Sequence, residues 1–438
     1  MKKALLFFLV YALSFAAECP VQPSTEGPAH YYGKLKVRKG KAFIDGVKTG
    51  AIAQIRGVSF FWSQWSGQFY NAAAVERLAK DWKAEVVRAA YGATGSTAAA
   101  DRQSIKTVVE AAIDNDIYVI IDWHSHSAHN ASETQRSIDF FSEMAQLYGS
   151  CDNVIFELYN EPTNAEWSVI KSYAEQVIAE IRKYSDNLIL VGTPNYSQKV
   201  QDITAIEDIN VGYVLHFYAA SHPLDSWRNN IDLALLRNLP IFVTEYGTTT
   251  ADGGCSPEVS NTCSSDNYNS HNLLSSDRWH SYMDKNKISS VAWSVFDKYE
   301  GSAFFGTVPG GAFDQSAENW SDTTKMTAAG KYIFKKLNKY YLTAPWNTVP
   351  VKPFVAVSES PGLEFLGGAR LIVSLPRSGS TSLEIFSLQG KKLGNLLAGE
   401  QNSGVFELSF SDLNLKAGAY ILLLKQGSQT KVLKIAKK

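Results

Sequence analysis

The chain lacks a strong charge of either sign, long apolar stretches after its first residues, and all but four cysteines. Its 438 residues include 42 Lys and Arg against 43 Asp and Glu, so the net charge is −1. Proteins that bind nucleic acid carry clustered positive charge, and this balance argues against such a partner. No apolar run after residue 16 approaches the roughly 20 residues that span a bilayer. A neutral or weakly charged partner therefore fits best.

Two common catalytic motifs are also absent from the sequence. There is no Gly-x-Ser-x-Gly segment, which places a nucleophilic serine at a strand-to-helix turn, and there is no phosphate-binding loop. An esterase of that type and a nucleotide-dependent enzyme are therefore disfavoured.

The first 16 residues have the pattern of an export signal. Two lysines precede an apolar run, and the segment ends in Ser14-Phe15-Ala16, a small-x-small cleavage site. We expect residues 1–16 to be removed and the mature protein to be secreted or attached to the cell surface.

The four cysteines of an exported chain favour disulfides over metal ligands. Cys255 and Cys263 are close in sequence and could close the loop that follows residue 245, which would leave Cys19 to pair with Cys151. Four cysteines allow three connectivities, so the pairing stays open at this point.

Between about residues 50 and 342, short apolar runs alternate with segments of helical period. Continuously apolar strands separated by helices are typical of a parallel sheet covered on both faces. Eight such units predict a (β/α)8 barrel, which we assign to residues 30–342, whereas the alternative, an open doubly wound sheet, usually has a Gly-rich first turn that this chain lacks. The runs are 52–58, 85–91, 118–122, 154–159, 188–191, 211–216, 241–244 and 290–293. The expected helices are 72–82, 103–115, 133–148, 168–184, 227–236, 277–285 and 326–337, and a hairpin is expected at 35–47.

Two of the apolar runs end in glutamates. Phe156-Glu157-Leu158-Tyr159-Asn160-Glu161-Pro162 closes the fourth run, and Val243-Thr244-Glu245-Tyr246-Gly247 closes the seventh. The carboxyl ends of all barrel strands meet at one mouth, so Glu161 and Glu245 are expected to face each other there. Other polar and aromatic residues should join them: Arg88 from within the second run, and Asp122, His124, Asn160, His216, Tyr218 and Trp293 at the ends of other runs.

A facing pair of carboxyl groups suits cleavage of a glycosidic bond. If the two groups lie about 5 to 5.5 Å apart, one acts as nucleophile and the other as acid and base, and the reaction retains anomeric configuration. Arg88 could hold Glu245 ionised, while the negative charge of one carboxylate helps to keep the other protonated. Asn160 is placed to bond a sugar 2-hydroxyl, Trp293 offers a stacking face, and His216 and Tyr218 could orient the pair.

These residues resemble glycoside hydrolase family 5, particularly its bacterial endo-β-1,4-glucanases. The resemblance covers about residues 30–342 and implies Glu161 as acid/base and Glu245 as nucleophile, with Lys298 and Glu300 contacting sugar hydroxyls. One departure is Phe61, which stands about where the family usually has a histidine. The matching segments are Arg56-Gly57-Val58-Ser59, Val87-Arg88, Ile120-Ile121-Asp122-Trp123-His124, Glu157-Leu158-Tyr159-Asn160-Glu161-Pro162, Leu215-His216-Phe217-Tyr218, Val243-Thr244-Glu245-Tyr246-Gly247 and Trp293-Ser294 through Asp297-Lys298.

Three histidines suggest an alternative to this interpretation. His124, His126 and His129 follow an aspartate at spacings that can ligate zinc, but no further cysteine or acidic ligand stands at a useful spacing. We prefer His124 as a substrate contact and expect neither a metal nor another cofactor.

The composition changes after residue 342. Prolines interrupt residues 343–362, which we interpret as a linker, and residues 363–438 show short alternating strands such as 370–375, 381–387, 405–410 and 419–425. A small β-sandwich is expected there. Its segments 383–391 and 415–420 resemble C-terminal sorting domains of type IX-like secretion systems, so sorting or surface attachment is favoured over carbohydrate binding.

The combined interpretation is a secreted, monomeric, retaining endo-β-1,4-glucanase whose partner is a β-glucan. The alternatives are another β-glycanase of the same fold, acting on mannan, xyloglucan or mixed-linkage glucan, and a non-catalytic carbohydrate-binding protein. The presence of both glutamates argues against the last of these.

Overall fold

The computed structural model describes residues 18–437 except for 93–97, 209, 252, 255–270, 298–299, 307–318, 348–360, 368–369, 376, 402–403, 411–412 and 414. The chain divides into two compact units, Met1–Asn347 and Thr348–Lys438. The expected signal segment and most of the expected linker lie outside the described residues.

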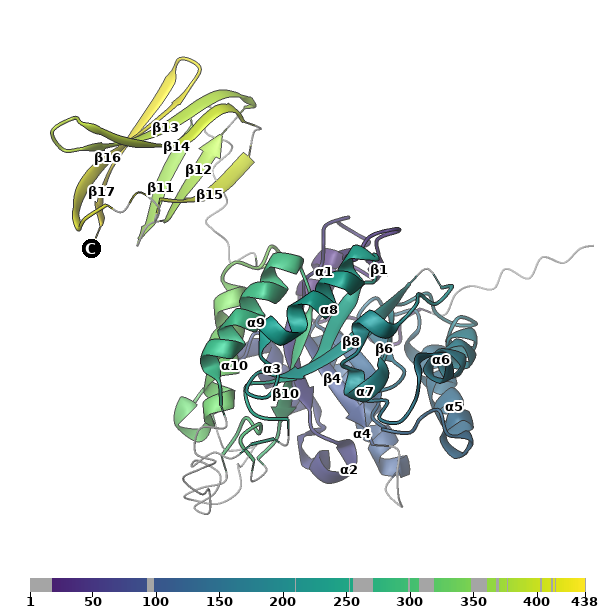
Figure 1. Cartoon of the computed structure of the whole chain (residues 1–438). Helices are drawn as coiled ribbons and strands as arrows, with labels where there is room; N and C mark the ends of the chain where they lie inside the picture. The colour runs from purple at the N-terminus through teal and green to yellow at the C-terminus, as the bar shows by residue number, and fades with distance from the viewer. Residues whose placement is uncertain are drawn as a thin grey trace, which may run out of the picture. The chain divides into compact units, whose positions relative to one another are not determined.

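The first unit is a closed barrel of eight parallel strands, as the sequence predicts (Figure 1). Each strand pairs with the next along the chain, and β10 closes the ring against β3. The doubly wound alternative is therefore wrong. The strands are β3 (Arg56–Phe60), β4 (Val86–Tyr91), β5 (Tyr118–Trp123), β6 (Val154–Glu157), β7 (Ile189–Val191), β8 (Val211–Tyr218), β9 (Ile241–Gly247) and β10 (Ser290–Val295).

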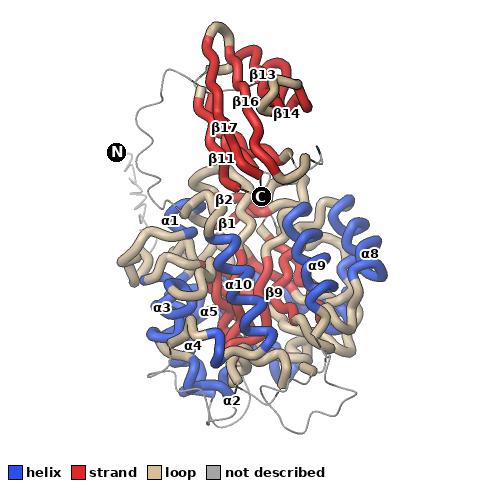
Figure 2. The backbone as a smooth tube through the Cα atoms, turned by 90° about the vertical axis from the view of Figure 1, so that its left-hand side faces the viewer, coloured by secondary structure: helices blue, strands red, loops and turns tan. Residues whose placement is uncertain are grey.

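Helices surround the barrel, and each predicted helix is present with ends shifted by a few residues (Figure 2). The segment between β7 and β8, where no helix is expected, holds only the short elements α7 (Pro194–Ser197) and η2 (Val200–Asp202). Within the described residues, no helix combines the length and apolarity that crossing a membrane requires. The helices are α2 (Ser63–Ser66), α3 (Ala72–Lys80), α4 (Ala98–Asp114), α5 (Ala131–Tyr148), α6 (Trp167–Ile181), α8 (Leu224–Leu236), α9 (Leu273–Asn286) and α10 (Ala328–Tyr341), with η1 (Gly67–Phe69) and η4 (Thr323–Lys325).

The alternation of side chains along each strand builds two apolar layers. In β5, Val119 and Ile121 belong to the large cluster that packs with the helices, whereas Tyr118 and Ile120 belong to a separate cluster inside the barrel. Successive residues of a strand point to opposite faces, so Asp122 shares the inner face with Ile120 but lies one step nearer the carboxyl end. The same alternation places charged side chains inside the barrel, on the carboxyl-terminal side of the apolar cluster.

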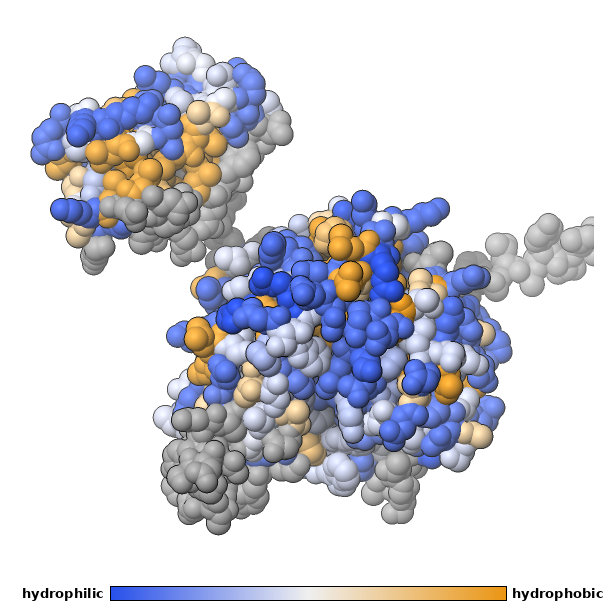
Figure 3. All heavy atoms as spheres, viewed as in Figure 1, coloured by the Kyte–Doolittle hydropathy of each residue, from blue (hydrophilic) through white to orange (hydrophobic). Residues whose placement is uncertain are grey.

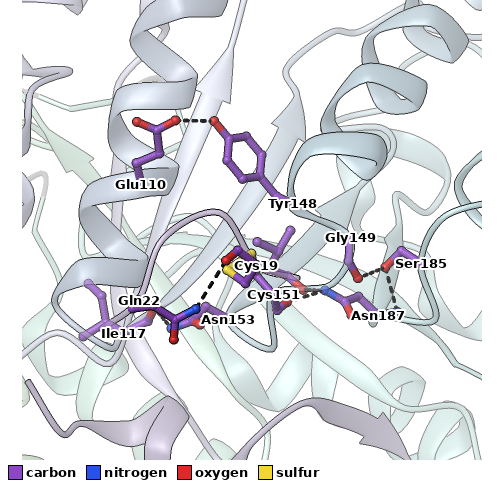
Figure 4. Close-up of a disulfide and its surroundings, with 11 residues drawn as sticks. Cys19, Gln22, Glu110, Ile117, Tyr148, Gly149, Cys151, Asn153, Ser185 and Asn187 are labelled. Atoms are coloured by element: carbon purple, nitrogen blue, oxygen red, sulfur yellow. Dashed lines mark hydrogen bonds between the residues drawn. A yellow bond between two sulfur atoms is a disulfide. The ribbon is translucent and has the colours of Figure 1, made fainter. Parts of the chain in front are cut away.

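The amino-terminal face of the barrel is covered by an early segment of the chain. It consists of α1 (Pro28–Tyr32) and the predicted hairpin, formed by β1 (Leu35–Val37) and β2 (Ile44–Gly46). Cys19 and Cys151 form a disulfide that ties this segment to the turn before β6 (Figure 4). One of the expected pairings is thus confirmed, while Cys255 and Cys263 lie outside the described residues.

The second unit consists of two antiparallel sheets, one of three strands and one of four. The four predicted strands are present, and β11, β14 and β17 add to them. The face of this unit drawn in Figure 3 gathers hydrophobic residues beneath a band of hydrophilic ones. The strands are β11 (Gly362–Gly367), β12 (Arg370–Leu375), β13 (Gly379–Ser387), β14 (Lys392–Gln401), β15 (Gly404–Ser409), β16 (Gly418–Gln426) and β17 (Gln429–Lys437).

Candidate active site

The strands bring the candidate residues to the carboxyl-terminal end of the barrel, the end where α2 lies in Figures 1 and 2. Hydrogen bonds and ring contacts join them there into one connected group around two glutamates. The members are Arg88 in β4, Asp122 in β5 with His124 after it, Asn160 and Glu161 after β6, His216 and Tyr218 in β8, Glu245 in β9, and Trp293 in β10.

Glu245 is buried and held at both carboxyl oxygens. The Tyr218 hydroxyl donates to Oε1 at 2.7 Å, and Nη1 of Arg88 donates to Oε2 at 3.1 Å. Both donors favour the ionised carboxylate. The two contacts also fix the direction in which the carboxyl group points, which a nucleophile requires.

Arg88 organises the buried charges of the site. Its guanidinium donates to both oxygens of Glu157, at 2.8 and 3.1 Å, and to Oδ1 of Asn160 at 2.6 Å. Nη2 also lies 2.9 Å from Oδ2 of Asp122. Burial acts to lower the pKa of Arg88, but the three surrounding carboxylates outweigh burial and raise it. The arginine therefore stays charged and cross-links four strands.

Glu161 lies at the rim of the same group and faces two histidines. Nδ1 of His216 is 2.9 Å from Oε1, and Nε2 of His126 is 3.3 Å from Oε2. The Glu161 backbone is held as well, since its N–H donates to the carbonyl of Ser125 at 3.2 Å. One ligand-type atom from each of Glu161, His216 and Glu245 lies within 4.8 Å of the others. The two carboxyl groups are therefore close enough to act on one bond.

The titration of this pair differs from the sequence-based expectation. Burial acts to raise the pKa of Glu161, but hydrogen bonds from His126 and His216 outweigh it and lower that pKa. Burial and the neighbouring charge of Glu161 raise the pKa of Glu245, against the opposing effects of His216 and Arg88. Burial would lower the pKa of His216, yet the bond with Glu161 and the charges of Glu245 and Glu161 raise it. The imidazole of His216 therefore competes with Glu161 for a proton across a contact of 2.9 Å.

The three closely spaced histidines do not come together as a zinc site. His124 Nδ1 is 2.6 Å from Asp122, His126 contacts Glu161, and His129 Nδ1 is 2.8 Å from the Tyr159 hydroxyl. Among the described residues, the one group with metal-ligand spacing is Glu161, His216 and Glu245. Within this group Nδ1 of His216 faces Glu161, and both oxygens of Glu245 accept hydrogen bonds.

Aromatic side chains form a wall beside the glutamates. Trp293 stacks on the His124 ring with centroids 5.4 Å apart, and its other neighbour, Phe61, lies 5.2 Å away. Trp62 extends the wall, and its ring centroid lies 5.2 Å from that of Trp65, a residue that is 62% exposed. Phe61 thus places an apolar ring beside Trp293, at the position where the resemblance implies a histidine.

Some residues of the site were missed by the sequence analysis. Trp62, Trp65 and Tyr196 present rings at the mouth. Tyr196 is exposed in α7, where the backbone is left-handed, and its ring centroid lies 6.4 Å from that of His126. Glu157 and Thr244 lie in the strands themselves. The sequence does contain a signal for these two residues, because a carboxylate at 157 and a hydroxyl at 244 interrupt runs that are otherwise apolar.

Two candidate residues, Lys298 and Glu300, follow β10. Glu300 lies against Gly253 and accepts a hydrogen bond from Ser302 at 2.5 Å, and its charge is among those that raise the pKa of Tyr218, after burial. It therefore belongs to the surroundings of the site. Lys298 lies outside the described residues.

The fold and the site together define a barrel enzyme with a glycosidase-type carboxylate pair. The family model described as cellulase (glycosyl hydrolase family 5) matches residues 44–298, and the chain belongs to this family.

Two similar proteins are named endoglucanases, which agrees with this assignment. The chain is 38% identical over 350 residues to endoglucanase Z of Dickeya dadantii, a match that covers 76% of this chain and 71% of the relative. It is 36% identical over 302 residues to endoglucanase A of Evansella cellulosilytica, covering 66% of this chain and 57% of that protein.

Solved structures have the same barrel. A structure from Cytophaga hutchinsonii has a TM-score of 0.64 at 36% identity and covers 72% of this chain and 97% of its own. The catalytic domain of Thermobifida fusca endoglucanase Cel5A has a TM-score of 0.62 at 29% identity, with 71% of this chain and 99% of that domain covered.

Proposed function

We propose that the chain is a secreted retaining endo-β-1,4-glucanase that hydrolyses cellulose or related β-glucans. The observation that carries the proposal is the proximity of Glu161 and Glu245 within one hydrogen-bonded group. Two carboxyl groups at this spacing leave no room for a water between the sugar and the second carboxylate, which favours a covalent intermediate. The endoglucanase names of the relatives support the substrate class.

The reaction takes two steps on these two residues. Glu245 attacks the anomeric carbon while the glycosidic C–O bond breaks and Glu161 transfers its proton to the leaving oxygen. Water then attacks the same carbon and gives a proton to Glu161, and the bond to Glu245 breaks. Arg88 and Tyr218 orient Glu245, and the Trp293 wall faces the sugar chain.

Variants of the two glutamates test this assignment. Reducing-end release from carboxymethylcellulose, glucomannan and xylan should be greatest on the first, and Glu161→Gln and Glu245→Gln should each lower it by roughly 10³-fold or more. Glu175→Gln, an exposed carboxylate of α6, serves as the control. Full activity in either active-site variant would contradict the assignment, and a preference for glucomannan or xylan would favour another β-glycanase.

An activated substrate separates the roles of the two residues. Glu161→Gln should still release a phenolate of low pKa from an aryl β-cellobioside, because that leaving group needs no proton. Glu245→Gln should release none. The NMR spectrum of the first product formed by the wild type should show the β-anomer, and an initial α-anomer would contradict retention.

We further propose that residues 363–438 serve in sorting or surface attachment. The resemblance of segments 383–391 and 415–420 supports this role. Carbohydrate modules bind sugars on exposed flat aromatic faces, but here Phe410 and Tyr420 are buried and the Tyr420 hydroxyl donates to the Lys416 carbonyl. The purified full-length chain and a chain ending at residue 347 should bind equally well to insoluble cellulose. Loss of binding in the shorter chain would favour a carbohydrate module.

A further inference from the structure

A line of hydrogen bonds connects Glu161 to a carboxylate deep inside the barrel. Nδ1 of His216 faces Glu161 at 2.9 Å, and Nε2 of the same ring lies 2.9 Å from the Thr244 hydroxyl. That hydroxyl donates to Oε1 of Glu157 at 2.8 Å. His216, Thr244 and Glu157 are all essentially inaccessible to solvent. Solvent water therefore cannot reach these three groups and compete for their hydrogen bonds.

The direction of each bond follows from the number of protons available. Glu157 accepts two bonds from Arg88, which favour its ionised form although burial raises its pKa. A hydroxyl has a single proton, and Thr244 uses it on the carboxylate. The Thr244 oxygen can only accept from His216, so Nε2 must carry a hydrogen.

We propose that Thr244 and Glu157 are positioning residues that hold His216 as the Nε2–H tautomer and so retain a proton between its Nδ1 and Oε1 of Glu161. The inference rests on the proposed role of Glu161 as acid/base. A neutral imidazole with hydrogen on Nε2 has a bare lone pair on Nδ1. That lone pair accepts from a protonated Glu161 but repels an ionised one. Loss of the last proton from the pair is therefore disfavoured.

Other charged groups near the pair do not fix the tautomer in this way. Nε2 of His216 has two described oxygen neighbours, the Thr244 hydroxyl and Glu157 Oε1 at 3.9 Å. The remaining groups act on both tautomers through their charge. These groups are Arg88 in β4, Asp122 in β5, His124 and His126 after β5, Tyr218 in β8, His222 after β8 and Glu245 in β9.

Removal of the Thr244 hydroxyl should change the alkaline limb of the pH profile. Without an acceptor at Nε2, the ring can move its hydrogen to Nδ1 and donate it to an ionised Glu161. That arrangement stabilises the pair after its proton is lost, so the proton should leave at lower pH. In Thr244→Val we expect the alkaline limb of kcat/KM to move by about one pH unit toward acid, which is about a tenfold loss on that limb.

Two further variants make this measurement specific. Thr244→Ser keeps the hydroxyl and should restore the wild-type limb. Thr193→Val removes a comparable buried hydroxyl, which donates to the Val214 carbonyl at 3.0 Å and has no described contact with His216, and should leave the limb in place. Equal limbs in folded Thr244→Val and Thr193→Val would overturn the proposal.

The tautomer itself can be observed in the wild-type protein. Side-chain 15N shifts of His216, assigned by comparison with His216→Gln, should show a protonated Nε2 and a bare Nδ1 at a pH where the ring is neutral. The reverse pattern would overturn the proposal even if Thr244→Val does not fold. Failure of the wild type to hydrolyse any β-glucan would instead contradict the proposed function, so the two failures are distinguishable.

Discussion

The two halves of the barrel interior differ although the same strands build both. We call the half at the amino-terminal ends of the strands the lower half. The half at their carboxyl-terminal ends, which is drawn at the bottom of Figures 1 and 2, is the upper half. The lower half is an apolar cluster that includes Val86 of β4, Ile155 of β6 and Val214 of β8. Two residues further along these strands, the inner positions are Arg88, Glu157 and His216, all fully or almost fully buried. A step of two residues thus changes the interior from a packed core into a group of charges.

The difference separates stability from chemistry. The lower half stabilises the fold by removing apolar surface from water, at about 25 cal/mol per Å². The upper half buries charges, which is unfavourable unless each charge is paired and hydrogen-bonded. Arg88 supplies much of that pairing for Asp122, Glu157 and Glu245. Substitutions in the two halves should therefore have different consequences.

The largest effect is expected from removing the charge of Arg88. Arg88→Met leaves buried carboxylates without their cation, and breaking such a group lowers the free energy of unfolding by about 3–5 kcal/mol. Leu190→Ala in the lower cluster should lower it by about 2–5 kcal/mol through the cavity it leaves. Urea unfolding measures both values, and kcat measured on the folded protein separates them.

The kcat values of these two variants distinguish the two halves of the barrel interior. The kcat of folded Arg88→Met should fall by at least tenfold, because Glu245 loses its contact, whereas Leu190→Ala should retain kcat within about threefold. Equal losses of kcat would mean that the two halves are not functionally distinct.

The second prediction concerns the disulfide at the amino-terminal face. Cys19 and Cys151 close a loop of 132 residues, and its loss should lower the free energy of unfolding by about 2–4 kcal/mol. Because the bond lies at the end of the barrel away from Glu161 and Glu245, the double variant Cys19→Ser/Cys151→Ser should keep the wild-type kcat at 25 °C. A changed kcat in a fully folded sample would show that the two ends of the barrel are coupled.

The third prediction uses the titration of Asp122. Burial raises its pKa to about 7, against the effect of Arg88, compared with about 3.9 in an unfolded chain. Between these values the folded state binds the extra proton, so this group's contribution to stability is complete below about pH 4 and is lost as the pH rises through about 7. Asp122→Asn should therefore flatten the fall in Tm between pH 4 and 7.

A matched variant controls for general effects of charge. Asp139→Asn alters an exposed carboxyl of α5 whose side chain accepts from Gln135, and it should leave the slope of Tm against pH unchanged. A wild-type slope in Asp122→Asn would mean that Asp122 is ionised throughout this range.

The smallest effect is expected from removing the second unit. A chain ending at Asn347 keeps Trp346, whose indole donates to Glu85 at 2.6 Å on the lower side of the barrel. Its kcat/KM on soluble carboxymethylcellulose should lie within about twofold of the full chain, since every described residue of the site precedes position 347. Abolished turnover would show that the second unit contributes to catalysis.

Much of the barrel was predictable because its signals are local. The eight apolar runs alternate with amphipathic segments, and all eight form strands within a few residues of the expected ends. The missed strands β11, β14 and β17 have weaker patterns; β14 includes Gly394 and Gly399, which reduce strand propensity. The short α7 was also missed, since its left-handed residues Asn195, Tyr196 and Ser197 follow no helical period.

The candidate site was predictable in its members but not in its connections. Strand-end positions identified Glu161 and Glu245, because parallel strands place their carboxyl ends together. Arg88 was identified as a charge within an apolar strand. The roles of His126, Thr244 and Glu157 were missed, since each depends on partners in other strands. The protonation order of Glu161 and Glu245 also differed from expectation, because two imidazoles approach one carboxyl group.

The sequence by itself determined the alternation of strands and helices, the order of the strands, and which chemical groups stand at their ends. These properties depend on residues that are near one another along the chain. The tertiary structure alone decided which groups share a proton or a charge. Arg88 meets Glu157 across 69 residues and Glu245 across 157, and Thr244 meets Glu157 across 87. Such contacts form only when the barrel closes, because closure brings distant strands to one mouth and excludes the water that would otherwise screen their charges.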